Sequence, residues 1–277
     1  MEDIAPRIKG ATNVVGEGSD SQDGTVGKAL SVLDAVAAFG RPVRFGELLQ
    51  DSPYPKATLY RLVQVLTKQS MLVYEPDRQT YAPGLRLVRL AHAAWQTTSL
   101  APVARPYLEA LSADIGETIH LAQLDGSSVL YVDKINARDP LQMYSQAGKV
   151  APCYCTGVGK AMIAFLPEDQ LEPILRQQSY HVFTAHTFPD AAALREELRA
   201  IVDRGHAYDR EEHEPGIICV AVPILTRSGR VLGAVSVTSS TERTSLTGLE
   251  AHLPRLHSAV SSIAGEAQAW RFPDAAE

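Results

Sequence analysis

Residues 56–69 constrain the fold more than any other stretch, because they predict a strongly amphipathic helix between clear turn signals. Four apolar residues at i, i+3, i+4 and i+7 form one face: Leu59, Leu62, Val63 and Leu66. At about 100° per residue, the opposite face carries Ala57, Arg61 and Gln64, flanked by Thr58 and Tyr60. The pattern predicts a helix that packs on a core with one side and presents polar groups with the other.

The surroundings of this helix predict a small DNA-binding fold. Two helices are expected before it, at residues 26–39 and 45–50, and a turn-rich segment at 51–55 leads into it. Two short apolar runs follow, at 71–74 and 80–82, around a turn that carries Arg78. Three helices and a hairpin predict a winged helix-turn-helix, whose second motif helix enters the major groove of DNA.

An all-α domain of another kind is the alternative, since a short helix, a turn and a longer helix occur in many proteins. The hairpin directly after the third helix favours DNA binding, because a wing adds a second contact with the duplex. We expect Tyr60 and Arg61 to reach base edges and Lys56 and Arg78 to contact phosphates. The candidate DNA-binding residues are Lys56, Ala57, Thr58, Tyr60, Arg61, Gln64 and Arg78.

The charge distribution favours nucleic acid although the chain is acidic overall, with a formal net charge of −6. Residues 25–98 hold nine Lys and Arg against five Asp and Glu, a net charge of +4. Residues 1–24 carry −3 and the remainder −7. A basic module beside an acidic one attracts phosphate and limits non-specific adhesion. Chance variation of surface charge is the alternative explanation.

Composition and the first residues exclude several classes of protein. A hydrophobic fraction of 45% with 21% charged residues predicts a folded core. No window approaches about 18 consecutive apolar residues, so no membrane span is expected. The N-terminus does not resemble a secretory signal. Three cysteines are too few for a disulfide framework, which predicts a cytoplasmic protein.

The rest of the chain predicts an α+β fold. Helices at 84–96 and 103–112 are interpreted as a connector. Strands are then expected at 118–124, 129–133, 141–145, 217–225 and 231–239, and helices at 158–165, 168–176, 191–204 and 245–269. Hairpins separated by helices indicate an antiparallel sheet. We expect a flexible tail over 1–24, the winged helix-turn-helix over 25–83, a helical connector over 84–113 and a second domain over 114–270.

Five short motifs occur in the order typical of one protein family. They are Pro55-Lys56-Ala57-Thr58-Leu59-Tyr60-Arg61-Leu62, Gly116-Glu117-Thr118-Ile119-His120-Leu121, Gly157-Val158-Gly159-Lys160-Ala161, Asp209-Arg210-Glu211-Glu212 and Glu214-Pro215-Gly216-Ile217-Ile218-Cys219-Val220-Ala221. Over residues 26–265 the chain resembles the IclR family of bacterial transcription regulators. The resemblance implies an N-terminal winged helix, a GAF-like effector-binding domain over 114–270, a homodimer or homotetramer, and small carboxylic acids as effectors.

Some positions depart from the family pattern. Pro53 stands where Gly is usual, Leu49 replaces a small residue, and Ala57 stands where Ser is common. These positions aim the recognition helix and set its first-turn phosphate contacts, so the operator sequence does not follow from the family. Cys153 and Cys155 are also not general to it.

The resemblance further implies an effector pocket formed by Met143, Ala151, Gly157, Val158, Asp209, Cys219, Ser236 and Thr238. Residues 156–161 lack the spacing of a phosphate-binding loop. The amides of Gly157 and Val158 open a helix, however, and a helix start binds anions. Gly157 would let a carboxylate approach the backbone. A glycine-rich helix start chosen for packing is the alternative.

The remaining pocket residues favour a hydroxylated ligand. Asp209 cannot neutralise an acid, but it can accept hydrogen bonds from hydroxyl groups. Ser236 and Thr238 fall on one face of a strand and are small donors. We therefore expect a sugar-derived acid, of the 2-keto-3-deoxy or aldonic type, rather than an aromatic acid.

The cysteines leave two alternatives open. Cys153 and Cys155 could make the protein a thiol-based redox-responsive regulator. Cys153 or Cys219 with a histidine could serve as nucleophile and base of an enzyme, but no histidine stands in a catalytic motif. A zinc site is not expected, because the cysteine spacing is unusual and His181 and His186 do not complete it. No catalytic residue, metal or cofactor is therefore predicted.

Together these features predict a sequence-specific DNA-binding regulator, a repressor of a catabolic operon that responds to a small organic acid. The expected partners are a pseudo-palindromic operator, the acid and further copies of the chain, with no membrane.

Overall fold

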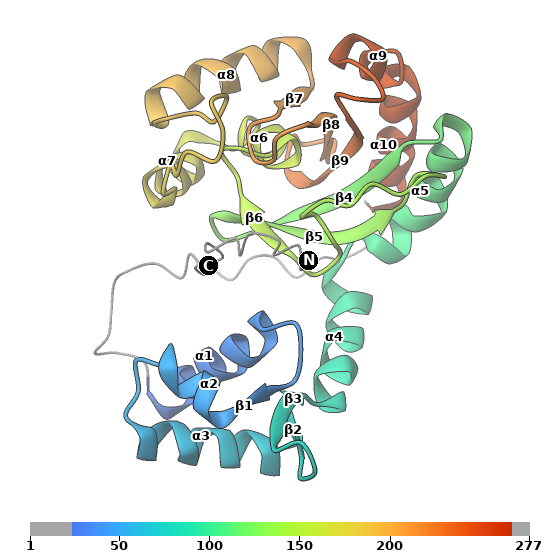
Figure 1. Ribbon diagram of the computed structural model, residues 1–277. Coiled ribbons are helices and arrows are strands. Elements are labelled where there is room, and N and C mark those ends of the chain that lie inside the picture. Colours follow the sequence, from blue (N-terminus) through green and yellow to red (C-terminus); the bar gives the residue numbers. More distant parts are fainter. Residues whose placement is uncertain (1–23, 268–277) are drawn as a thin grey trace, which may run out of the picture. The chain divides into compact units, whose positions relative to one another are not determined.

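The computed structural model describes residues 24–267, and the chain divides into two compact units, Met1–Ala94 and Trp95–Glu277 (Figure 1). Of the predicted tail over 1–24, all but Gly24 lies outside the described residues. Helix α4 (Leu85–Thr98) contains the division point, so the predicted connector over 84–113 belongs partly to each unit. The domain limits expected from the sequence stay a prediction.

The first unit has the predicted three helices and hairpin. The helices are α1 (Thr25–Ala38), α2 (Phe45–Gln50) and α3 (Lys56–Lys68), and the hairpin strands are β2 (Leu72–Glu75) and β3 (Thr80–Pro83). A further strand, β1 (Val43–Arg44), pairs with β3, which gives an antiparallel sheet of order β1-β3-β2. A two-residue strand shows no alternation, so the sequence did not predict it.

The apolar face predicted for residues 56–69 holds α3 on the core of this unit. All four of its members are buried: Leu59, Leu62, Val63 and Leu66. The hairpin closes against the end of α3 at Gly84, whose amide donates to the carbonyl oxygen of Met71 at 2.8 Å. A Cβ at Gly84 would lie 2.2 Å from the carbonyl oxygen of Ser70, so only glycine fits.

The second unit is the predicted α+β domain. Its strands are β4 (Thr118–Asp125), β5 (Ser128–Ile135), β6 (Val150–Pro152), β7 (Ala207–Arg210), β8 (Ile217–Leu225) and β9 (Val231–Ser240). They form an antiparallel sheet of order β6-β5-β4-β9-β8-β7. Its helices are α5 (Ala101–Ile115), α6 (Gly157–Ile163), α7 (Glu168–Gln177), α8 (Ala191–Arg204), α9 (Leu246–Glu250) and α10 (Leu253–Ala267).

Helices cover both faces of this sheet, because successive strand residues point to opposite sides. Val220 and Val222 of β8 share a core with residues of α5, α9 and α10. Ala221, between them, shares the other core with residues of α6, α7 and α8. Figure 1 shows α6, α7 and α8 apart from α5 and α10 around the sheet.

Three elements differ from the expectation. Residues 141–145 are not a strand, and β6 pairs with β5 instead; the segment between β5 and β6 is held by the polar contacts described below. The helix expected over 245–269 is interrupted between α9 and α10. Pro254, the second residue of α10, has no amide hydrogen to donate to the preceding turn. Residues 268 and 269 lie outside the described residues. Strand β7 was missed, because its four residues are a strand only through pairing with β8. Within the described residues, no helix is both long and apolar enough to cross a membrane.

Candidate DNA interface and effector cavity

The candidate DNA interface is the solvent side of α3 together with the turn between β2 and β3. Thr58 is half-buried, and the other predicted contacts are exposed: Lys56, Ala57, Tyr60, Arg61, Gln64 and Arg78. The Tyr60 ring packs edge-on against Phe45 of α2, with ring centroids 5.8 Å apart. Gln64 Nε2 donates to the Tyr81 hydroxyl at 3.5 Å, which turns this side chain toward the hairpin.

The second unit contains a cavity on the sheet face that α6 covers. Six of the residues predicted for the effector pocket line it: Gly157, Val158, Asp209, Cys219, Ser236 and Thr238. Ala151 lies on β6 in the adjoining core, and Met143 is buried in the segment between β5 and β6; neither is among the lining residues. The cavity is small, with a volume of about 30 Å³.

The start of α6 forms one wall of the cavity. The first amides of a helix have no acceptor within the helix, and those of Gly157 and Val158 belong to lining residues. Both glycines of this helix are also required by packing. A Cβ at Gly157 would lie 2.4 Å from Cys219 Sγ, and one at Gly159 would lie 2.6 Å from the Cys153 carbonyl oxygen. The packing explanation, which the sequence left as the alternative, therefore applies to both.

Asp209 on β7 forms the acidic wall. Its Oδ1 accepts a hydrogen bond from the Glu212 amide at 2.8 Å. Burial, followed by the negative charge of Glu212, raises the pKa of Asp209 to about 8, against the opposing effect of Lys160. The raised pKa favours the protonated carboxyl, which can donate a hydrogen bond as well as accept one. The sequence predicted an acceptor only.

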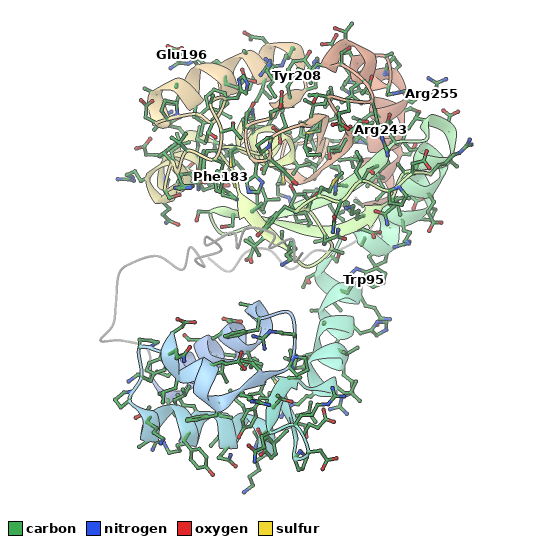
Figure 2. All side chains as sticks on the ribbon, viewed as in Figure 1. Trp95, Phe183, Glu196, Tyr208, Arg243 and Arg255 are labelled. Atoms are coloured by element: carbon green, nitrogen blue, oxygen red, sulfur yellow. The ribbon has the colours of Figure 1, made fainter. Side chains whose placement is uncertain are left out.

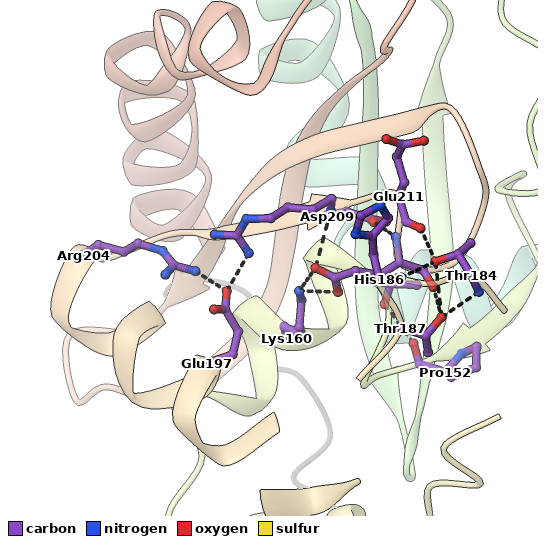
Figure 3. Close-up of polar contacts among 12 residues, drawn as sticks. Pro152, Lys160, Thr184, His186, Thr187, Glu197, Arg204, Asp209 and Glu211 are labelled. Carbon is purple, nitrogen blue, oxygen red and sulfur yellow. Dashed lines mark hydrogen bonds and ion pairs between the residues drawn. The ribbon is translucent and has the colours of Figure 1, made fainter. Parts of the chain in front are cut away.

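Behind Asp209 lies a buried ion pair that sequence reasoning did not identify (Figure 3). Lys160 of α6 donates to both carboxylate oxygens of Glu212, and its Nζ lies 4.7 Å from the centroid of the Phe188 ring. The hydroxyl of Thr187 donates to the Glu212 carbonyl oxygen at 2.6 Å, and that of Thr184 donates to the Glu211 carbonyl oxygen at 2.6 Å. These contacts tie α6, the segment between α7 and α8, and the segment after β7 together.

The largest omission of the sequence reasoning is His120 of β4, which is buried and lines the cavity. Its Nδ1 lies 3.1 Å from Thr238 Oγ1 and 3.4 Å from Ser236 Oγ, and its Nε2 lies 2.8 Å from Ser145 Oγ. A signal was present: polar Thr118 and His120 alternate with apolar Ile119 and Leu121, as Ser236 and Thr238 alternate with Val235 and Val237.

Aromatic side chains lie beside one another at the cavity. The rings of Tyr144 and His213, both lining residues, are tilted at 58° with centroids 5.1 Å apart. The ring centroid of Phe183, which Figure 2 labels, lies 4.7 Å from that of His213. Burial lowers the pKa of His213, as it does that of His120. Both imidazoles are therefore held neutral, and the cavity presents neutral donors and acceptors beside its acids.

The cysteines do not form a reactive site. Cys153, Cys155 and Cys219 are free and buried. Burial raises the pKa of Cys153 to about 12 and also raises the pKa values of the other two thiols. A thiol that stays protonated is a poor nucleophile and a poor target for oxidants. In the part of the chain that the structure describes, no three His, Cys, Asp or Glu side chains gather as a metal site would require.

Two family models match the chain in the order of its two units. The IclR helix-turn-helix domain matches residues 25–76, and the model described as bacterial transcriptional regulator IclR C-terminal matches residues 92–265. The chain belongs to the IclR family. It is accordingly a DNA-binding transcriptional regulator and not an enzyme. The resemblance predicted from the motifs is confirmed, and the alternatives built on cysteine chemistry are not favoured.

Individual relatives agree. The chain is 32% identical over 249 residues to the HTH-type transcriptional regulator KdgR of Escherichia coli K12, covering 89% of this chain and 95% of the relative. It is 27% identical over 218 residues to the transcriptional repressor IclR of the same organism, covering 78% and 80%. A solved IclR homolog from Microbacterium hydrocarbonoxydans, complexed with 4-hydroxybenzoate, matches with a TM-score of 0.76 at 20% identity and covers 89% and 100%. At 20% identity, the similarity to this structure shows a shared fold alone.

Proposed function

We propose that this IclR-family regulator represses a catabolic operon in the cytoplasm. A small hydroxy or keto acid, bound in the cavity of its second unit, changes its affinity for the operator. The observation that supports an effector site is the lining of the cavity, which combines helix-start amides, the buried carboxyl of Asp209 and the small hydroxyls of Ser236 and Thr238. Relatives named as repressors support the sign of regulation.

The cavity chemistry favours a hydroxylated acid. The amides of Gly157 and Val158 offer donors to a carboxylate, and protonated Asp209 adds a further donor without placing a second negative charge beside it. Ser236 and Thr238 offer hydroxyls at the far side. A sugar-derived acid uses all of these groups, whereas 4-hydroxybenzoate, the ligand in the Microbacterium structure, carries one hydroxyl.

The effector proposal is tested by a thermal-shift screen followed by calorimetry. A ligand that binds only the native state stabilises by RT ln(1 + [L]/Kd), so a 100-fold excess over Kd adds about 2.7 kcal/mol. The screen compares 2-keto-3-deoxygluconate, gluconate, pyruvate, hexanoate and 4-hydroxybenzoate, each with and without operator DNA. We expect the hydroxylated sugar acids to stabilise most and to bind free and DNA-bound protein unequally. Equal affinity for the two states would reject the acid as the signal.

We propose that α3 reads base edges with Tyr60 and Arg61, while Lys56 and Arg78 contact phosphates. The exposure of these side chains on one helix and the neighbouring hairpin turn supports this division. One arginine placed on a guanine contributes about 1–3 kcal/mol of discrimination, whereas a phosphate contact mainly sets the salt dependence.

We propose that the protein acts as a homodimer or as a homotetramer on a pseudo-palindromic operator. One winged helix buries too little DNA for high specificity, and a second copy supplies the other half-site. Helix α4 spans 14 residues, and none of its side chains is fully buried. Leu85 and Val88 on it are 83% and 63% exposed, and Val26 of α1 is 74% exposed. A second copy of the chain is the partner that would cover these faces.

A further inference from the structure

His120 is the centre of a polar network that lines the cavity. The network contains partners on a neighbouring strand and a partner on a segment outside the sheet. Ser236 and Thr238, which share Nδ1, stand on β9 and are fixed by the sheet; His120 and Ser236 are paired residues of β4 and β9. Ser145, which contacts Nε2 at 2.8 Å, stands instead on the segment of residues 136–149 between β5 and β6. The sheet partners are therefore rigid, and the Ser145 partner is the exchangeable one.

The 136–149 segment is anchored towards both ends. The Ala137 amide donates to Thr118 Oγ1 at 3.3 Å, Arg243 donates to the Asp139 carbonyl oxygen at 2.6 Å, and the Gly148 amide donates to the Tyr131 carbonyl oxygen at 2.7 Å. Further polar contacts hold its middle part on the cavity. Besides the contact of Ser145 Oγ with His120, the Tyr144 amide donates to Glu214 Oε2 at 3.0 Å. Lys134 Nζ donates to the Ser145 carbonyl oxygen at 2.8 Å. Outside regular structure, such a segment opens more easily than the strands beside it.

The size of the cavity requires that something moves. A cavity of about 30 Å³ is small for a six-carbon acid. The walls on β4, β8 and β9 belong to the sheet, and the start of α6 is packed so tightly that its two glycines admit no side chain. Two walls lie outside helices and strands. One carries Tyr144 and Ser145, and the other carries His213 and Glu214, which follow β7.

We infer that His120 is a specificity-determining residue for the effector, and that a hydroxyl or carbonyl oxygen of the ligand replaces Ser145 Oγ at Nε2 and thereby loosens the middle part of the 136–149 segment. This rests on the proposed acid-binding function. Burial, and next the positive charge of Lys134, lowers the pKa of His120 to about 3, so the ring stays neutral. A neutral ring offers one donor and one acceptor, which matches an uncharged oxygen of the ligand rather than its carboxylate.

The role of the Ser145–His120 contact in holding the 136–149 segment is tested without any ligand. Hydrogen exchange of the amides of residues 136–149 is compared in the wild type, in Ser145→Ala and in the matched control Ser228→Ala, whose serine lies on the exposed turn between β8 and β9. Loss of one hydrogen bond is expected to accelerate exchange about 2- to 10-fold in Ser145→Ala only. If exchange in Ser145→Ala equals that of the wild type, the Ser145–His120 contact does not hold the segment, and the inference is overturned.

The specificity role is tested with 2-keto-3-deoxygluconate and hexanoate, which have equal carbon number. Ser145→Ala is expected to bind the sugar acid about 2- to 10-fold more tightly, because no internal bond must be broken. His120→Phe is expected to lose at least about 10-fold for the sugar acid relative to hexanoate. An unchanged Kd in Ser145→Ala, or equal losses for both acids in His120→Phe, would overturn the assignment. If neither acid binds the wild type, the proposed sugar-acid effector is wrong. The exchange experiment still shows whether the Ser145–His120 contact holds the 136–149 segment.

Discussion

Removing Lys160 from its buried ion pair with Glu212 is expected to destabilise the second unit strongly. The side chains of Lys160 and Glu212 are 0% and 2% exposed. In Lys160→Met, Glu212 would stay in the interior without its cation. Breaking a buried pair by removing one partner costs about 3–5 kcal/mol, whereas replacing both by apolar groups is often neutral. The double variant Lys160→Met/Glu212→Leu is therefore expected to recover most of the loss.

The expected shift in melting temperature follows from the size of the unit. At about 2–4 °C per kcal/mol for a domain of 150–250 residues, the single variant should melt roughly 6–20 °C below the wild type. Both tryptophans of the chain, Trp95 and Trp270, lie outside Met1–Ala94. Tryptophan fluorescence therefore follows the unit that contains the pair, in the intact protein. The control is Arg176→Met, which removes the exposed pair with Glu172 and should cost less than about 1 kcal/mol.

The pH dependence gives a second readout of the same reasoning. Burial raises the pKa of Glu212 and Lys160 opposes that shift, so removal of Lys160 raises the pKa of Glu212 further. A group with a raised folded-state pKa contributes stability below its unfolded pKa and loses it as the pH rises through the folded value. The defect of Lys160→Met should therefore be smaller at pH 5 than at pH 8. A single variant as stable as the wild type, or a double variant no better than the single one, would refute the argument.

Three further predictions concern DNA, assembly and the effector. Arg61→Ala should weaken binding to a cognate duplex more than to a scrambled one, by about 1–3 kcal/mol. Lys56→Ala should weaken binding to both duplexes equally, and titrations over a range of salt should show that the slope of log K against log salt concentration falls by about one. Equal losses for the two duplexes in Arg61→Ala would contradict base reading. Leu85→Glu/Val88→Glu should shift the protein toward monomers in light scattering at micromolar concentration, while Arg89→Glu on the same helix serves as the charge control, and an unchanged mass would remove α4 from the interface. Affinity for a sugar acid should fall above about pH 8. Burial raises the pKa of Asp209 to about 8, and above that pH the side chain becomes negative beside the bound carboxylate. Asp209→Asn should abolish this dependence in calorimetry, and a wild-type affinity that does not change between pH 6 and pH 9.5 would contradict it.

The sequence by itself determined the parts of this protein that depend on local pattern. The helical spacing of Leu59, Leu62, Val63 and Leu66 predicted α3, and the turn at 75–79 predicted the hairpin after it. The motif order then identified the family. Six of the eight predicted pocket residues line one cavity, because the family resemblance transfers positions within strands and helix starts that the fold keeps in place.

Tertiary structure alone decided the features that depend on residues far apart in the chain. Strand β7 exists through its pairing with β8, and residues 141–145 are held by side-chain contacts such as those of Glu214 and His120 rather than by strand pairing. The same holds for charge. Whether Asp209 is protonated depends on its burial and on the distance to Glu212 and Lys160, and neither quantity is encoded in local periodicity. Burial and proximity arise only when the chain has folded, because they are set by the packing of separate elements against one another.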